Sequence, residues 1–321
     1  MGSVYATTAD EVVWWAKSQK GYCEKKTNAY LDDFTANAGS NNYNKFARDL
    51  YSQGYFNGNK NGYAWCACFA AWIFLQACGE KTKARRITAQ DRGTYGAGCD
   101  FAKAYYKAEG RLYTTPKVGD QVFFKQSGKI VHTGLVIGVG STYITTIEGN
   151  KNNKVTQCSY LRSSSYIDSY GRPNYDSVQW TKDTEGKWWL TINGEAVQDA
   201  WYRYYNKWYW MKPGGIMAEN EFIEYNGASY YLKDGGAMAT GWLKLDGKWY
   251  YFNGSGAMQK STWLKYNSKW YYLMADGVMA TGWLKWKDQW YYLDSSGAMV
   301  TGTQKIDGIT YTFSASGAKQ G

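Results

Sequence analysis

The chain has 321 residues, 18% of them aromatic, and a formal net charge of +10. This length predicts two domains. The basic charge predicts a polyanionic partner, but the lysines and arginines are scattered along the sequence instead of forming a stripe, which disfavours nucleic acid. The sequence also lacks a run of about 18 or more apolar residues that could span a membrane.

Three helices are predicted in the first half of the chain, at residues 12–19, 43–51 and 66–77. The third follows a segment rich in Gly and Asn and stops at Gly79. Cys66 opens this helix, where unpaired N–H groups and the helix dipole favour a thiolate and lower its pKa from about 8.5. Cys68 and Cys78 lie further inside, where a cysteine is usually an inert apolar residue. Cys66 is therefore the candidate nucleophile.

The chain contains six cysteines, all in its first half, and a single histidine, His132. Cys66 and Cys68 lack the C-x₂₋₄-C spacing of structural zinc sites, and one imidazole is too few for zinc-dependent wall hydrolases. We therefore predict no metal. Disulfides are not expected, because the protein is expected to be made in a reducing compartment. A Cys/His catalytic pair must use His132.

A hairpin is predicted around His132, because two β-branched runs flank residues 138–141. If the turn is centred near Gly140, His132 lies directly opposite Glu148, close enough for the carboxylate to hold the imidazole. Asn150 lies two residues further and shares that face. We expect an antiparallel sheet from about residue 121 onward.

The composition changes near residues 175–180, which predicts domains at 1–175 and 176–321. The second domain contains seven copies of a unit of 20 or 21 residues, which begin at Trp180, Trp201, Phe222, Trp242, Trp263, Trp283 and Gln304. Each unit is typical of a β-hairpin. Because a lone hairpin is marginally stable in water, neighbouring hairpins should stack into a solenoid with atypical end repeats as caps.

The aromatic residues cover both faces of a hairpin, since Trp249 and Tyr251 share one face and Tyr250 takes the other. They could serve only as a core, but we favour cages for a cation, which aromatic faces attract. Cages are predicted at Trp242, Trp249 and Trp270, and at Trp263, Trp270 and Trp290. The candidate ligand-binding residues are Trp242, Trp249, Tyr251, Met258, Trp263, Trp270, Tyr272, Trp283, Trp290 and Tyr292.

Residues 180–321 resemble the choline-binding repeats of bacterial and phage wall proteins, through the leading GW, the WYY triplet and the closing GAM of residues 241–258 and 282–299. In that family the ligand is the choline of teichoic acids. Residues 1–175 resemble CHAP-type cysteine amidases and peptidases, through YAWCACFAAW, VGDQVFF, VHTGLV and TIEGN. The implied fold is an α+β papain-like (CHAP) domain followed by an all-β solenoid of stacked β-hairpin repeats.

The CHAP resemblance also implies roles for individual residues. Cys66 would be the nucleophile, with its own amide in the oxyanion hole, and His132 the general base. Glu148 would orient the imidazole, and Asn150 would be a supporting polar group. The resemblance implies no cofactor. Calcium is not indicated, because the sequence lacks a D-x-[DN]-x-[DN]-G loop.

Together the two halves resemble a modular phage endolysin, which implies a cysteine-dependent peptidoglycan hydrolase anchored to choline-bearing teichoic acid. We expect an N-acetylmuramoyl-L-alanine amidase. A stem or cross-bridge endopeptidase, a non-catalytic wall-binding protein and a glucan-binding or toxin-type repeat array are the alternatives, and a homodimer linked through choline stays open. Residues 1–22 lack the features of a secretory signal, so we expect synthesis in the host cytoplasm and action at the wall after release.

Overall fold

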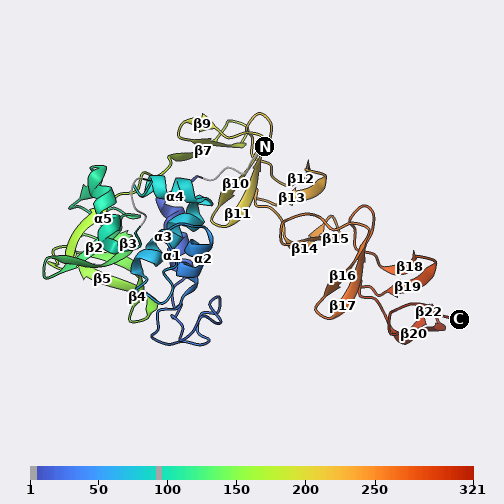
Figure 1. Cartoon of the computed structure of the whole chain (residues 1–321). Coiled ribbons are helices and arrows are strands. Elements are labelled where there is room, and N and C mark those ends of the chain that lie inside the picture. Colours follow the sequence, from blue (N-terminus) through green and yellow to red (C-terminus); the bar gives the residue numbers. More distant parts are fainter. Residues whose placement is uncertain (1–5, 92–95) are drawn as a thin grey trace. The chain divides into compact units, whose positions relative to one another are not determined.

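The computed structural model describes residues 6–91 and 96–321 (Figure 1). The chain divides into two compact units, Met1–Asn206 and Lys207–Gly321. The change of architecture comes earlier, between the last strand of a six-stranded sheet, β6 (Ile167–Gly171), and the first hairpin strand, β7 (Val178–Lys182). The predicted domains, 1–175 and 176–321, follow this change of architecture and stay a prediction.

Five helices lie among the described residues of the first unit: α1 (Ala9–Ser18), α2 (Lys45–Ser52), α3 (Cys66–Cys78), α4 (Lys81–Ile87) and α5 (Cys99–Ala108). The three predicted helices correspond to α1, α2 and α3. The prediction missed α4 and α5 because their start signals are weak. The N-cap of α4 is a glutamate, and α5 follows Gly98 without a side-chain cap.

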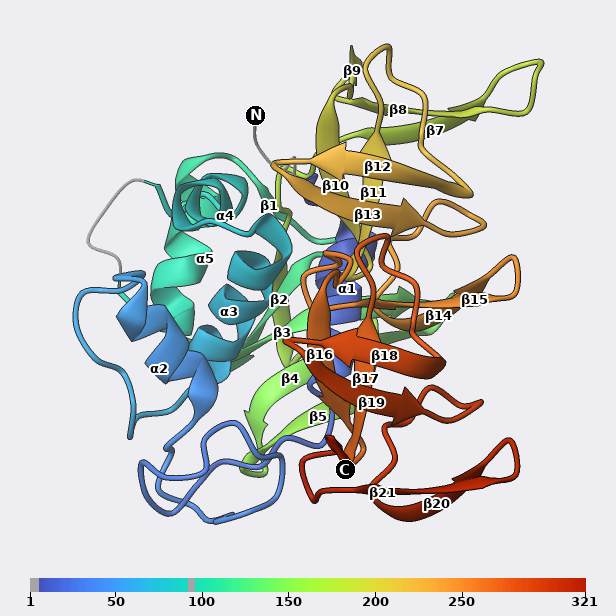
Figure 2. The same ribbon diagram turned by 90° about the vertical axis from the view of Figure 1, so that its right-hand side faces the viewer.

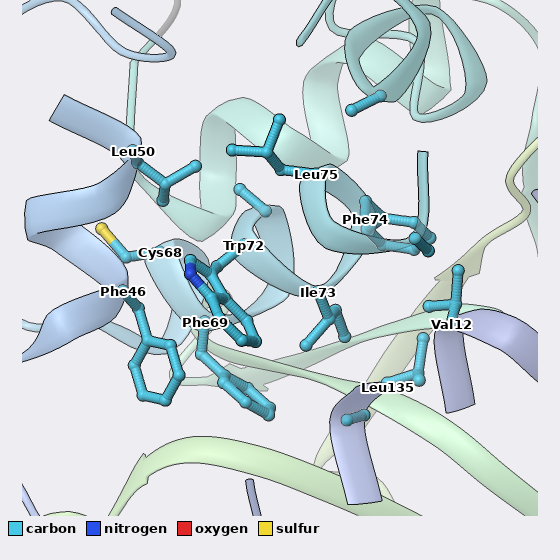
Figure 3. Close-up of a cluster of buried hydrophobic side chains, with 14 of the residues drawn as sticks. Val12, Phe46, Leu50, Cys68, Phe69, Trp72, Ile73, Phe74, Leu75 and Leu135 are labelled. Carbon is cyan, nitrogen blue, oxygen red and sulfur yellow. The ribbon is translucent and has the colours of Figure 1, made fainter. Parts of the chain in front are cut away.

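Helix α3 forms the centre of the first unit. Every residue of this helix except Gln76 is buried, which is typical of a helix that is covered on all sides. Val12 of α1, Phe46 of α2 and Leu135 of the strand β3 (Lys129–Val139) surround it (Figure 3). The helix ends where Gly79 adopts the left-handed conformation with φ 75°, which glycine tolerates without steric cost. The predicted stop at Gly79 is confirmed.

The sheet is antiparallel and has the strand order β1-β6-β2-β3-β4-β5. Its remaining strands are β1 (Leu112–Tyr113), β2 (Gln121–Gln126), β3 (Lys129–Val139), β4 (Tyr143–Lys151) and β5 (Lys154–Leu161). Helix α3 contacts β3 and β4 at the middle of this sheet. The expected antiparallel sheet from residue 121 is confirmed, and β1 adds a short strand before it.

The first unit also contains β8 (Trp188–Ile192), β9 (Glu195–Ala196) and β10 (Ala200–Tyr204), and β11 (Lys207–Met211) opens the second unit. Successive hairpins follow in the second unit (Figure 2). Their strands are β12 (Glu221–Tyr225), β13 (Ala228–Leu232), β14 (Gly241–Leu245), β15 (Lys248–Phe252), β16 (Thr262–Tyr266), β17 (Lys269–Leu273), β18 (Gly282–Trp286), β19 (Gln289–Leu293), β20 (Gly302–Ile306), β21 (Ile309–Phe313) and β22 (Lys319–Gln320). The predicted hairpin architecture is confirmed.

The hairpins have tight two-residue turns. Asp246 and Gly247 have φ values of 46° and 82°, and a turn with two positive φ values matches the twist of the strands it joins. The last hairpin corrects one predicted position. Gly302 pairs with Phe313 as Gly282 pairs with Leu293. Thr303, and not Gln304, therefore takes the leading position, because this repeat is one residue shorter than the spacing suggested.

Consecutive hairpins of the second unit are joined by backbone hydrogen bonds. The N–H groups of Met258, Met279 and Met299 donate to the carbonyls of Ser229, Trp249 and Trp270 in the preceding repeat, each at 2.8 Å. Each methionine also forms an isolated bridge with the second strand of its own repeat. The hairpins thus stack in series, as a repeat unit too small to bury its own apolar face requires.

Candidate active site and aromatic cages

The candidate nucleophile, Cys66, is the first residue of α3, as predicted. Its side chain is 8% exposed. The N-cap residue, Trp65, makes no side-chain capping bond, so N–H groups at this helix start are available to a negative charge. Two contacts hold the indole of Trp65 in place: its Nε1 donates to Glu24 Oε2 at 2.7 Å, and its ring stacks on Phe46. The thiol is thereby held on a rigid element.

His132 of β3 and Glu148 of β4 form the predicted pair. The imidazole Nε2 lies 2.9 Å from Glu148 Oε2. The Glu148 side chain is fully buried, and its carboxylate also accepts hydrogen bonds from the hydroxyls of Thr146 and Tyr160. The imidazole ring stacks on Phe124, at 5.8 Å between centroids. Because Glu148 takes Nε2, Nδ1 is the ring nitrogen that can exchange a proton with another group.

The strand register differs from the prediction. Leu135 pairs with Ile147 and Val136 with Thr146. Continued along the strands, this register sets Glu148 opposite Gly134 and diagonal to His132. The reason is the position of the turn: Val139 pairs with Ile144, so the turn is centred between residues 141 and 142 and not at Gly140. The bulge between Val136 and Gly138 reverses this shift by only one residue.

Gly134 makes the diagonal contact between His132 and Glu148 possible. A Cβ at this position would lie 2.6 Å from Glu148 Cγ. The missing side chain therefore leaves the space through which the glutamate reaches the imidazole. Long side chains span such diagonal pairs.

The Cys66 thiol lies beside the strand that carries His132, because the backbone N–H of Thr133 is one of its hydrogen-bond partners. The predicted low pKa is wrong for this structure. Contact with the Cys99 thiol and burial raise the pKa of the Cys66 thiol well above its usual value, whereas the N–H groups of Ala67 and Thr133 lower it. The place of Cys66 at a helix start is therefore not enough to lower the pKa of its thiol.

The sequence reasoning missed Cys99. This residue is the first of α5, and its S–H contacts the carbonyl of Ile130 at 3.8 Å. The hydrogen bond with Cys66 lowers the pKa of the Cys99 thiol. Two helix starts thus bring two thiols together. The available signal was a glycine followed by a cysteine at a helix start, but α5 itself was not predicted.

Asn150 contacts the residues at the start of α3. It adopts φ 60°, and the register between β4 and β5 shifts between Glu148 and Lys151, so strand alternation does not extend to this residue. In the orientation that satisfies both ends of its amide, Asn150 donates to Glu24 Oε2 at 3.2 Å and accepts from the Trp65 N–H at 3.1 Å. The structure therefore places the Asn150 amide at the start of α3.

In the second unit, aromatic side chains of consecutive hairpins enclose a cavity of about 310 Å³. Its lining includes Trp263, Trp270, Trp286, Tyr291 and Met299. The Trp263 ring lies 5.1 Å from Tyr291 and 6.0 Å from Trp286, between centroids. Trp270 is 40% exposed, which is unusual for a side chain that serves only as core. We name this group the second cage.

The preceding pair of hairpins repeats the arrangement, and we name this group the first cage. The Trp242 ring lies 5.1 Å from Tyr271, 6.3 Å from Tyr266 and 6.3 Å from Trp249. Met279 closes the group, since its N–H donates to the Trp249 carbonyl. Each cage thus combines two tryptophans of one hairpin with two aromatics and a methionine of the next.

The predicted cage residues are only partly grouped as expected. The next hairpin contributes Tyr271 and Tyr291, where Trp270 and Trp290 were predicted, and Met279 and Met299 take the place expected for Met258. The reason is strand alternation: the middle residue of each WYY triplet faces the preceding hairpin. The prediction also missed Tyr266 and Trp286, although these are aromatic where two other repeats have Leu245 and Ile306.

The other predicted residues lie near these groups. Tyr251, Tyr272 and Tyr292 are cross-strand partners of the leading tryptophans of their own hairpins, at 5.2 Å between ring centroids. Trp283 and Trp290 lie 6.2 Å apart at the start of a third group of rings. Across residues 6–91 and 96–321, no helix is long and apolar enough to cross a membrane.

Comparisons with known proteins identify both halves of the chain. Residues 58–150 match the CHAP domain, and residues 222–263 and 261–301 match the choline-binding repeat. No curated protein sequence matches the chain.

Three solved structures illustrate the likeness. CbpJ from Streptococcus pneumoniae is 25% identical, with a TM-score of 0.41, over 61% of this chain and 73% of that one. The modular autolysin LytC from Streptococcus pneumoniae is 32% identical, with a TM-score of 0.22, over 44% of this chain and 42% of its own. The modular Cpl-1 endolysin is 31% identical, with a TM-score of 0.30, over 44% of this chain and 46% of its own.

The match at residues 58–150 includes Cys66, His132 and Glu148, and the match at residues 222–301 includes both aromatic cages. The chain therefore joins a CHAP domain, the catalytic domain of cysteine-dependent peptidoglycan hydrolases, to choline-binding repeats.

Proposed function

We propose that the chain hydrolyses the N-acetylmuramoyl-L-alanine amide of peptidoglycan, with Cys66 as nucleophile, His132 as general base and Glu148 as the orienting residue. The observation that supports these roles best is the 2.9 Å contact between His132 Nε2 and the buried Glu148 carboxylate. This contact holds the imidazole and leaves its Nδ1 available. The N–H of the next residue on the strand, Thr133, is hydrogen-bonded to the Cys66 thiol. Nucleophile, base and orienting group are the parts that thiol catalysis of acyl transfer requires.

The reaction proceeds by acyl transfer. His132 takes the proton of the Cys66 thiol, and the sulfur attacks the amide carbonyl carbon. The Cys66 N–H, at the start of α3, donates to the developing oxyanion. The imidazolium then protonates the leaving amine, and the C–N bond breaks to leave a thioester. Water, deprotonated by His132, attacks the thioester and releases the carboxylate and the thiol.

Glu148 orients the imidazole throughout this reaction. It accepts three hydrogen bonds and keeps the imidazole in one orientation and tautomer. Contact with Cys99 and burial raise the pKa of the Cys66 thiol, so formation of the thiolate depends on transfer of its proton to His132.

Analysis of the cleaved bond tests the amidase assignment. Purified walls are digested, and the fragments are analysed by mass spectrometry with labelling of new N-terminal amines. We expect new amines on L-alanine and free muramoyl carboxylates. A new amine on any other residue would replace the amidase by a stem or cross-bridge endopeptidase.

We further propose that the two aromatic cages bind choline of teichoic acid and so hold the enzyme at the bacterial wall. A trimethylammonium group donates no hydrogen bond, and aromatic faces attract it electrostatically, with about 0.5 to 2 kcal/mol for each contact. Because each cage is weak, a polymeric ligand that fills both gains affinity through their linkage.

Retention on a choline resin tests this anchoring. Trp270→Ala removes an exposed wall of the second cage, and we expect elution at a lower concentration of free choline. Ile309→Ala, at a position that is 58% exposed in the last hairpin, is the control and should elute with the wild type. If both variants elute like the wild type, the cage assignment is wrong.

A further inference from the structure

Two further groups of aromatic rings lie next to the cages in the second unit, one on each side of them. They follow the same plan, but each differs from the cages at more than one position. In the later group a lysine takes the place of the methionine of the cages. In the earlier group a lysine lies beside the serine that replaces the second tryptophan. These lysines distinguish the groups that can take a cation from those that cannot.

The group after the cages lies between the last two hairpins. Three of its rings match those of the cages, since Trp283 lies 4.9 Å from Tyr311 and 6.2 Å from Trp290, but Ile306 stands where the cages have Tyr266 and Trp286. The wall residue differs. Lys319 pairs with Phe313 as Met299 pairs with Leu293, so a lysine stands where both cages have a methionine.

The Lys319 ammonium lies over the ring that would hold a ligand. Its Nζ is 5.7 Å from the Tyr311 centroid and donates to the carbonyl of Gly321 at 2.9 Å. The side chain is half-buried. An ammonium over an aromatic face makes the same interaction that a trimethylammonium group would make, and two cations at one face repel each other.

The group before the cages contains a lysine as well. Ser229 replaces the second tryptophan, because its carbonyl accepts from the Met258 N–H as that of Trp249 accepts from Met279. Ser229 is 2% exposed. Its hydroxyl is bonded to Glu224, and the Lys260 ammonium donates to it. Here both the indole and the space beside it are lost.

We propose that Lys319 closes the last group of aromatic rings to choline, so that three well-placed rings bind no ligand while the two cages with methionine walls stay open. This inference rests on the proposed choline binding of the cages. The chain's own ammonium group takes the place of the ligand in this group, as Lys260 does beside Ser229. The repeats between residues 222 and 321 therefore present two choline sites, although the aromatic motif extends over more repeats.

Other lysines show which position matters. Lys244 and Lys265 lie 5.9 Å and 5.8 Å from the centroids of Trp249 and Trp270. Both are exposed residues of the first strand of their own hairpin, and the methionine wall remains in place in their cages. Lys265 is therefore the matched control for Lys319.

The test compares full-length wild type, Lys319→Met and Lys265→Met by equilibrium dialysis with radiolabelled choline at saturation. We expect Lys319→Met to bind one equivalent more per chain than the wild type, and Lys265→Met to bind the same number as the wild type. Lys319→Gln removes the charge and keeps a polar side chain of similar length, and it replaces Lys319→Met in the test if the methionine variant does not fold. We expect Lys319→Gln to bind one equivalent of choline more than the wild type as well.

An unchanged number of sites in a folded Lys319 variant would overturn this inference and leave choline binding intact. An added site in Lys265→Met would also overturn it, because the gain would then not depend on the wall position. If neither the wild type nor any variant binds choline, the proposed anchoring itself fails and this inference fails with it.

Discussion

The active site and the aromatic cages are built in opposite ways. Cys66, Cys99, His132 and Glu148 come from four elements separated by many residues, and the site is buried and occurs once. Each cage comes from two consecutive hairpins, is partly exposed and occurs in several versions. A single change can therefore abolish catalysis, whereas the repeats can lose or close one cage and keep another. Chemistry needs one fixed geometry, and anchoring needs only enough weak sites.

Loss of the nucleophile should separate the two regions most clearly. We expect Cys66→Ala to lower the rate of wall clearing by a factor of about 10³ or more, while retention on choline resin stays unchanged. Turbidity of choline-containing Gram-positive walls, with and without excess free choline, measures both effects. Clearing by the variant at the wild-type rate would remove Cys66 from the mechanism.

Neutralising the orienting group should have the next largest effect. Glu148→Gln keeps the shape but removes the charge that holds the imidazole, and we expect kcat to fall by a factor of about 10² to 10⁴. Tyr160→Phe removes a neutral donor to the same carboxylate and should cost only about 0.5 to 1.5 kcal/mol. Equal losses in the two variants would contradict the role of the Glu148 charge.

The space at Gly134 gives a smaller and independent test. In Gly134→Ala the new Cβ meets Glu148 Cγ at 2.6 Å, so we expect a loss of about 1 to 3 kcal/mol in stability and a lower rate. Gly138→Ala is the control on the same strand, because its nearest neighbour, Thr145 Cβ, is 3.5 Å away. Denaturant unfolding and wall clearing measure the two effects. Similar stability and activity in both variants would show that the diagonal contact does not depend on this glycine.

Removal of Cys99 should have the smallest effect. Contact with the Cys99 thiol raises the pKa of Cys66, so in Cys99→Ala this pKa should fall and more thiolate should exist at a given pH. We expect alkylation of Cys66 by iodoacetamide at neutral pH to become several-fold faster, and the alkaline rise of its pH profile to move to lower pH. Cys23→Ala is the control. A slower reaction in Cys99→Ala would mean that the second thiol stabilises the thiolate instead.

Local patterns predicted the elements of both regions well. The start of α3 at Cys66, its end at Gly79 and the strands that carry His132 and Glu148 all follow from signals within a few residues. The hairpin repeats follow from their turns and from the alternation of their strands. The choice of nucleophile and base rested on a single histidine and on a helix start, and needed no knowledge of distant contacts.

Contacts between elements were decided only by the tertiary structure. The position of the turn between β3 and β4 set Glu148 diagonal to His132, and Gly134 made that position workable. Helix α5 brought Cys99 against Cys66 and reversed the direction of the pKa shift. In the repeats, stacking selected Tyr271 and Tyr291 as cage walls and left Lys319 in place of a methionine. The sequence determines which groups each element carries, because periodicity and turns act over a few residues. Packing decides which groups meet, because close contacts depend on register and approach between distant parts of the chain.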